Sequence, residues 1–260
     1  MPPRVSLLAS LAVGGAIVAR ERRSRQAIER FAAAALETLL NAIEANDAQT
    51  GQHVRRVAAC ALVLADAAGL DERRRRSVER IALFHDIGKI HEALFDIVHD
   101  DTRLTPPERR EIHTHPARGA RVLAPLAAFY PELAEGVLSH HERWDGTGYP
   151  RRLRGARIPL AARIVSIADT FDAVAHSRRY RRGRGVAAAV DVVAAGRGTQ
   201  FDPDLVDVAL LPPIRQRLEA IERAAAGGAD HGGRAGRRGQ QRERVPDVSF
   251  RWRSGSLRPR

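Results

Sequence analysis

Residues 81–89 read IALFHDIGK, and this stretch decides the fold because it places a histidine and an aspartate directly after an apolar helical run. Charged groups are rarely buried unless they are paired or bind a metal, since desolvating an unpaired charge is costly. His85 and Asp86 therefore need a partner. Lys89, three residues after Asp86, is the only lysine among the 43 Lys and Arg residues of the chain.

The sequence around this stretch predicts an all-α protein. Of its 260 residues, 44% are hydrophobic and only 5% are aromatic, and apolar residues recur at three- and four-residue steps. No alternating apolar and polar stretch is long enough for a confident strand. A helix start is predicted at Thr105, followed by Pro106, Pro107 and Glu108. Helices are expected over 24–46, 50–68, 71–85, 108–124, 132–143, 159–177, 185–195 and 203–226, with a loop over 90–107.

Composition shifts divide the chain into four segments. We expect a short apolar segment over 1–23, a connector helix over 24–44, the main domain over 45–226 and a disordered Gly/Arg-rich tail over 227–260. Residues 5–19 span about 22 Å as a helix, which is short of the ~30 Å hydrocarbon core of a bilayer. The sequence thus predicts a cytoplasmic protein and leaves open whether residues 5–19 anchor it to the inner face of the cell membrane.

The net charge of +12 belongs mainly to the two ends of the chain. Residues 1–30 hold six arginines and two glutamates, and residues 227–260 hold nine arginines and three acidic residues. Because the domain between them is nearly neutral, specific nucleic-acid binding is not expected. The single cysteine, Cys60, excludes an internal disulfide framework and is typical of a reducing compartment.

Polar residues with metal-ligand chemistry occur in a fixed order on successive predicted helices. They are His53, His85, Asp86, His115, His140, His141 and Asp169. Each has an ordinary explanation when taken alone: a histidine at a helix end is often a surface residue, and Asp169 could pair with Arg163. Five imidazoles and two carboxylates together suit two ions of iron, manganese or zinc. Two such metals about 3.5–4 Å apart activate water for attack at phosphorus.

Asp86 of this set and Lys89 receive catalytic roles. Asp86 can bridge two metals because its two oxygens can face different ions. Lys89 lies one helical turn after Asp86 on the same face, and its ammonium suits a phosphate oxygen beside a metal. The alternative for Lys89 is an exposed lysine at a helix end.

The order of four motifs resembles the HD-GYP family, a subgroup of the HD superfamily of metal-dependent phosphohydrolases. These motifs are HDIGK (85–89), HPxxG (115–119), HHERWDGTGYP (140–150), and the helix with Asp169 that leads to GTQFDP (198–203). The resemblance covers about residues 45–206. It implies a helical bundle with a metal site in its core and hydrolysis of cyclic di-GMP to pGpG and often to GMP.

The resemblance also implies a role for each matched residue. The seven residues named above would bind two divalent ions, with His115 preferred over His113 because Pro116 and Gly119 follow it. The implied substrate contacts are Lys89, Gly148, Tyr149, Arg178 and Arg181. The family further implies a signalling partner, such as a GGDEF-type cyclase bound through the GYP loop, and a homodimer as a candidate assembly.

The sequence departs from the family pattern at three places, one of which is Arg179, where the family usually has proline. Members with a third metal have a glutamate where this chain has Gln49, so we predict a site for two ions. The segment 91–102 differs from the usual Lys-Pro-Gly-containing loop beside the site. Two alternatives to cyclic di-GMP hydrolysis remain: an HD phosphohydrolase for another nucleotide or cyclic dinucleotide, and a non-catalytic module that binds a partner.

Overall fold

The computed structural model describes residues 4–90, 105–176 and 183–229. These residues form helices and no named strand, with one isolated bridge between Arg197 and Phe201. The all-α prediction is confirmed. Residues 40–234 form one compact unit, which contains the described helices except most of α1. The helices are α1 (Arg4–Asn46), α2 (Ala48–Ala67), α3 (Glu72–Phe84), α5 (Pro106–Ile112), α6 (His115–Leu123), α7 (Leu133–Ser139), α8 (Leu160–Ala175), α9 (Val186–Ala195), α10 (Pro203–Leu210) and α11 (Pro212–Ala229), with 3-10 turns η1 (Ile87–Ile90), η2 (Ala124–Leu126) and η3 (Gly155–Arg157).

Capping side chains fix the starts of α2, α3 and α5. Asp47 accepts a hydrogen bond from the Gln49 amide at the start of α2, and Asp71 accepts one from the Arg74 amide at the start of α3. Thr105 and Glu108 form a reciprocal capping box at the start of α5, with proline in the first turn. The helix start predicted at Thr105 is therefore confirmed.

Two predicted helices are each divided in the structure. The expected helix 108–124 consists of α5 and α6, separated at residues 113–114, and the expected helix 203–226 consists of α10 and α11, separated at Leu211. Pro116 follows the first break, and Pro212 and Pro213 follow the second. Proline lacks an amide hydrogen and disfavours helical geometry in the residue before it, so a helix ends near each of these positions.

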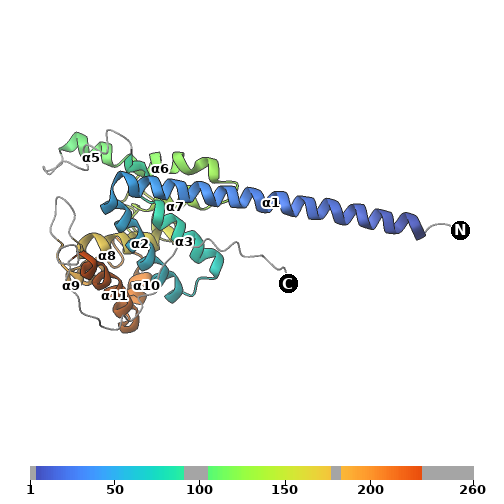
Figure 1. Ribbon diagram of the computed structural model, residues 1–260. Coiled ribbons are helices and arrows are strands. Elements are labelled where there is room, and N and C mark those ends of the chain that lie inside the picture. The colour runs from blue at the N-terminus through green and yellow to red at the C-terminus, as the bar shows by residue number, and fades with distance from the viewer. Residues whose placement is uncertain (1–3, 91–104, 177–182, 230–260) are drawn as a thin grey trace, which may run out of the picture. The chain divides into compact units, whose positions relative to one another are not determined.

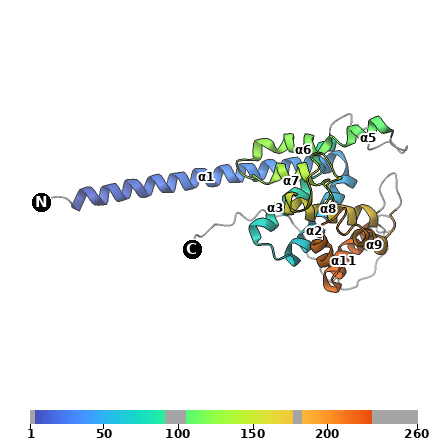
Figure 2. The same ribbon diagram turned by 180° about the vertical axis from the view of Figure 1, so that it is seen from behind.

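Helix α2 lies at the centre of the compact unit. It packs on α3, α8 and α11, while α3 also packs on α7 and α8, and α6 packs on α7 and η1 (Figures 1 and 2). The apolar run that ends α3 is fully enclosed, since Ile81, Ala82, Leu83 and Phe84 are each at most 1% exposed. His85 follows directly, so the core of the bundle delivers the HD motif to a buried position.

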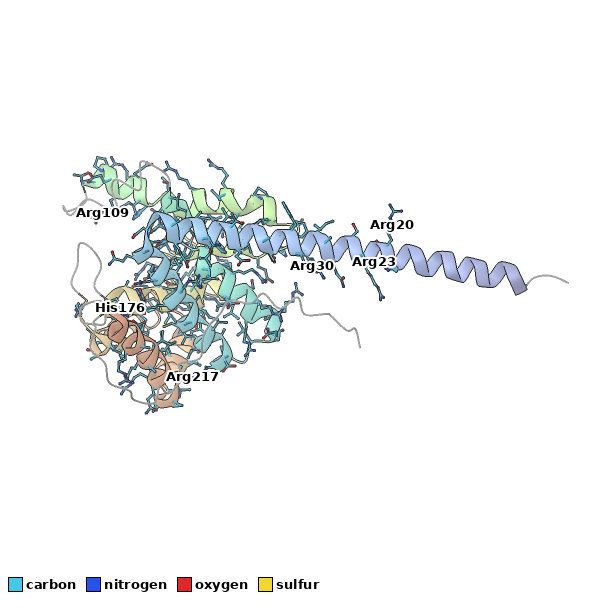
Figure 3. The ribbon with its side chains drawn as sticks, in the orientation of Figure 1. Arg20, Arg23, Arg30, Arg109, His176 and Arg217 are labelled. Carbon is cyan, nitrogen blue, oxygen red and sulfur yellow. The ribbon has the colours of Figure 1, made fainter. Side chains whose placement is uncertain are left out.

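Helix α1 carries exposed arginines. Arg20, Arg23 and Arg30 are exposed, and Figure 3 shows their side chains projecting from the helix. Within the described part of the chain, no helix is long and apolar enough to cross a membrane. The predicted disordered tail lies almost entirely outside the described residues.

Gly136 allows the close approach of α7 and α3, which leads to a stability prediction. A Cβ atom at Gly136 would lie 2.3 Å from Cδ1 of Ile81 and 2.7 Å from its Cγ1. We expect Gly136→Ala to lower the free energy of unfolding by about 1–3 kcal/mol, because Ile81 is enclosed and cannot move aside. Thermal or urea unfolding measures this loss.

Ile81→Val supplies the matched control, because it removes the methyl group nearest to the new Cβ. Alone it should cost about 0.5–1.5 kcal/mol. The double variant should lose less stability than the two single losses added together. Additive losses would show that the Gly136–Ile81 contact is not the cause.

Candidate metal centre

The compact unit brings all seven predicted ligands together in two adjoining groups. In each group one ligand atom per residue lies within 4.8 Å of the others. The first group contains Asp86, His115, His140 and His141, and the second contains His53, His85 and Asp169. The side chains come from α2, α6 and α8 and from the residues that follow α3 and α7. Segments far apart in the sequence therefore converge as the motif order predicts.

Three of the imidazole rings are oriented by the same kind of hydrogen bond to the backbone. The Nδ1 atoms of His85, His115 and His140 lie 2.8, 2.6 and 2.6 Å from the carbonyl oxygens of Ala82, Ile112 and Val137, each three residues earlier. A carbonyl oxygen only accepts hydrogen bonds, so Nδ1 of each ring is the protonated nitrogen. In a neutral ring Nε2 then carries a lone pair.

The carbonyls that hold these rings are available because a helix ends beside each histidine. His85 and His140 directly follow α3 and α7, and Ile112 is the last residue of α5. The last four carbonyls of a helix lack a partner within it and can accept a hydrogen bond from a side chain. The chain breaks that end these helices thus also set the ring orientation.

Asp86 lies between the two groups. Its Oδ1 is 3.3 Å from Nε2 of His115 and 3.8 Å from Nε2 of His140, whereas its Oδ2 is 3.4 Å from Nε2 of His85. The two carboxylate oxygens therefore face different groups, which is the geometry of a bridging ligand. In the second group Oδ1 of Asp169 lies 3.3 Å from Nε2 of His53 and 3.8 Å from Nε2 of His85.

Several contacts around Asp86 would be stabilised by a cation. Nε2 of His115 lies 3.3 Å from Nε2 of His140, although both rings already donate from Nδ1. Two lone pairs at that distance repel unless a proton or a metal ion lies between them. Nε2 of His85 and Oδ1 of Asp86 are also buried without a hydrogen-bond partner. Buried polar atoms of this kind are suited to bind a cation, and imidazole with carboxylate suits a divalent transition metal.

The protonation of the first group favours metal binding. Burial lowers the pKa of His140 well below its usual value and lowers the pKa of His141 to about 3. Burial also lowers the pKa of His115. These three rings are therefore neutral near pH 7. Burial alone would raise the pKa of Asp86, but the charges of Lys89 and His85 hold it well below the usual value, so Asp86 is a carboxylate.

Lys89 forms an ion pair with Asp86. Its Nζ lies 2.6 Å from Oδ2 of Asp86, and the side chain is 24% exposed. The amine is thus at the edge of the site with one side open to solvent. This contact places Lys89 beside the proposed bridging carboxylate.

The GYP loop covers the first group through Tyr149. The Tyr149 ring stacks between His113, at a centroid distance of 4.0 Å, and His141, at 4.9 Å. The Tyr149–Pro150 peptide bond is cis. Gly148 packs against backbone, since a Cβ there would lie 2.3 Å from the Arg143 amide nitrogen. Gly148 therefore also has a packing role.

Two acidic residues at the site were not identified from the sequence. Glu142 is 2% exposed and accepts hydrogen bonds from the amides of Arg151 and Leu153, which holds the loop after the GYP motif. Asp172 accepts a hydrogen bond of 2.5 Å from Nδ1 of His53. Asp172 lies three residues after Asp169 in an apolar helix, and this signal could have revealed it.

The remaining predictions have mixed outcomes. Arg163, the alternative partner of Asp169, pairs with Asp202 at 2.5 Å. Gln49 is exposed. Arg178, Arg181 and the segment 91–102 lie outside the described residues.

The comparison with family models matches residues 37–205 to the HD domain. The chain belongs to the HD domain family. Two relatives named as cyclic di-GMP phosphodiesterases are 36% and 32% identical to this chain. Their similarity confirms the predicted membership of the HD-GYP group.

Three curated relatives show the extent of the similarity. The "Cyclic di-GMP phosphodiesterase response regulator RpfG" of Xanthomonas campestris is 36% identical over 77% of this chain and 50% of its own length. The "3'3'-cGAMP-specific phosphodiesterase 2" of Vibrio cholerae is 36% identical over 66% of this chain and 33% of its own. The "Cyclic di-GMP phosphodiesterase" of Thermotoga maritima is 32% identical over 78% and 56%. This HD domain chain thus spans between a third and a little over half of these relatives.

A solved structure supports the fold alone. A protein titled as a HDG"Y"P protein from Bdellovibrio bacteriovorus has a TM-score of 0.52 with 21% sequence identity, over 67% of this chain and 52% of the other. The helical bundle of the HD domain is thereby confirmed.

His113 and His115 are two residues apart and give a matched test of the first group. His115 is fully buried with Nε2 facing Asp86, whereas His113 is exposed and stacks on Tyr149. We expect His115→Ala to lose the ion of the first group and His113→Ala to keep the full metal content. Elemental analysis of the purified chains measures both. Equal loss in the two variants would contradict this assignment.

Proposed function

We propose that the chain is a metal-dependent cyclic dinucleotide phosphodiesterase that hydrolyses cyclic di-GMP to pGpG, GMP or both. The observation that carries the proposal is the convergence of three histidine Nε2 atoms on the Asp86 carboxylate, with a 3.3 Å approach of His115 to His140. Relatives named as cyclic di-GMP phosphodiesterases support the substrate class.

The proposed site holds two divalent ions, of iron or manganese first and zinc second. One ion would be held by the group of His115, His140 and His141 and the other by the group of His53, His85 and Asp169, with Asp86 shared. Such ions would supply activation of water and neutralisation of charge at the phosphoryl group. Two groups that meet at one carboxylate favour two ions over a single one.

The protein residues would orient the substrate around this centre. Lys89 would bind a phosphate oxygen, because its ammonium lies at the edge of the site and is partly open to solvent. Tyr149 would present its ring or hydroxyl from the stacked position over His141, and Gly148 would let the loop backbone approach closely. Arg178 and Arg181 stay predicted phosphate contacts.

Two other functions are kept as alternatives. Relatives named as 3'3'-cGAMP-specific phosphodiesterases favour a second cyclic dinucleotide as substrate. A non-catalytic role, in which the GYP loop binds a GGDEF-type cyclase, would leave the metal ligands without a purpose. A homodimer and membrane association through residues 5–19 also stay proposals.

The full chain loaded anaerobically with Fe(II) or Mn(II) tests the proposed reaction. We expect conversion of cyclic di-GMP to pGpG or GMP, measured by chromatography, and a loss of at least ~10²-fold in Asp86→Asn, because the shared ligand loses its charge. Asp66→Asn is the matched control, since Asp66 lies on the surface in ion pairs with Arg75 and Arg217. Turnover of 3'3'-cGAMP alone would favour the second substrate. A metal-loaded chain that converts neither dinucleotide would refute the proposal.

Lys89 gives a separate test of substrate binding. Lys89→Ala should keep both ions, because the amine is no metal ligand, and should raise KM for cyclic di-GMP by about 10-fold or more through loss of a charged phosphate contact. Lys89→Arg should recover part of the loss. Steady-state kinetics and metal content are measured together. Metal loss in Lys89→Ala would instead assign the lysine to stabilising Asp86.

A further inference from the structure

His53 differs from the other buried ligand histidines in how its ring is held. It lies in the second turn of α2, away from a helix end, and its Nδ1 donates to the Asp172 carboxylate instead of to a carbonyl three residues earlier. The orientation of His53 thus depends on a side chain of α8. When a carboxylate orients a ligand histidine, the groups that position the carboxylate also affect the orientation of the histidine ring.

Asp172 contacts two basic side chains besides His53. It is 1% exposed and forms an ion pair with the Arg56 guanidinium, whose Nη2 lies 3.3 Å from Oδ2. Nδ1 of His176 lies 3.6 Å from Oδ1. Burial alone would raise the pKa of Asp172, but the bonds from His53 and Arg56 hold it below the usual value.

Glu222 of α11 completes this chain of contacts. It is 2% exposed, forms an ion pair with Nδ1 of His176, and accepts a weak hydrogen bond from Sγ of Cys60 at 3.6 Å. His176 follows the last residue of α8, and Figure 3 labels it close to α11. One imidazole therefore faces two buried carboxylates, one from α8 and one from α11.

Asp172, His176 and Glu222 also have the composition of a metal site, but Arg56 argues against an ion there. Their ligand atoms lie within 4.8 Å of one another. However, the Arg56 guanidinium contacts both oxygens of Asp172, and His53 takes one of them as well. A divalent cation on Asp172 would lie beside a permanent positive charge. The cluster is better explained as a balance of two carboxylates with Arg56 and His176.

We propose that Glu222 is a positioning residue for the metal centre, which acts through His176 and Asp172 on the ring of His53. Glu222 lies in α11, outside the matched HD domain, which ends at residue 205. A helix beyond the matched domain would thus contribute to the metal centre. Without the Glu222 carboxylate, the His176 ring would lose its partner on α11 and would move toward Asp172. The hydrogen bond between His53 and Asp172 would then weaken. The inference rests on the proposed role of His53 as a metal ligand.

Retention of metal against a chelator in the full chain tests the proposal. We expect Glu222→Gln to release one of two ions at about 10-fold lower chelator concentration, because changes outside the ligand shell reduce metal affinity by 10–100-fold. The other ion, held by the group of His115 and His140, should stay as in the wild type. His176→Gln should behave in the same way, and Glu222→Asp should restore part of the affinity.

Glu219→Gln is the matched control on the same helix, because Glu219 pairs only locally with Arg215 at 3.2 Å. It should retain both ions. The NMR chemical shift of the His53 ring proton in the metal-free chain gives a second test. This chemical shift should change in Glu222→Gln and not in Glu219→Gln.

The outcomes separate this inference from the proposed function. Wild-type retention of both ions in a less stable Glu222→Gln would show a structural role only and overturn the inference. A third ion in the wild type that Glu222→Gln removes would also overturn it, since Glu222 would then be a ligand. A wild-type chain that binds two ions but hydrolyses no dinucleotide would refute the proposed function alone. A chain that binds no ion would refute both.

Discussion

Three imidazole rings direct Nε2 toward the Asp86 carboxylate because Nδ1 of each ring donates to a backbone carbonyl three residues earlier. This arrangement depends on the positions at which helices end. The breaks after α3, α5 and α7 leave carbonyls without partners, and the rings satisfy them. The same bonds fix a proton on Nδ1 of each ring, so Nε2 of each ring points inward. The proposed metal site is therefore a consequence of helix termination as much as of ligand identity.

The core of the bundle keeps this arrangement rigid. Helix α2 packs on α3, α8 and α11, and the enclosed run 81–84 brings Asp86 to the point where the two ligand groups meet. His53 and Asp169 approach from α2 and α8, and Asp172 one turn further along α8 holds the His53 ring. The candidate ligands of the site thus come from helices that are distant in the sequence. The carboxylate of Asp86 is the group that both sets of ligands share.

The motif order was sufficient to predict the bundle and the convergence of the seven candidate ligand side chains. The sequence did not reveal the division of the helices over 108–124 and 203–226, because periodic apolar residues continue across each break and only the prolines mark it. It also missed Asp172, Glu142 and Glu222, whose roles come from packing between segments. Gly148 and Tyr149 were expected at the substrate, and the structure adds that one packs on backbone while the other stacks between two histidines. Contacts of this kind depend on three-dimensional proximity, which spacing along the chain does not give.

Anomalous diffraction from a crystal of the metal-loaded chain, recorded at the absorption edge of the bound metal, tests the central claim most directly. The account predicts two peaks per chain, one within bonding distance of His115, His140 and His141 and one within bonding distance of His53, His85 and Asp169, with Asp86 contacting both. A single peak that leaves either group without an ion, or a peak bound only by residues outside these two groups, would contradict it.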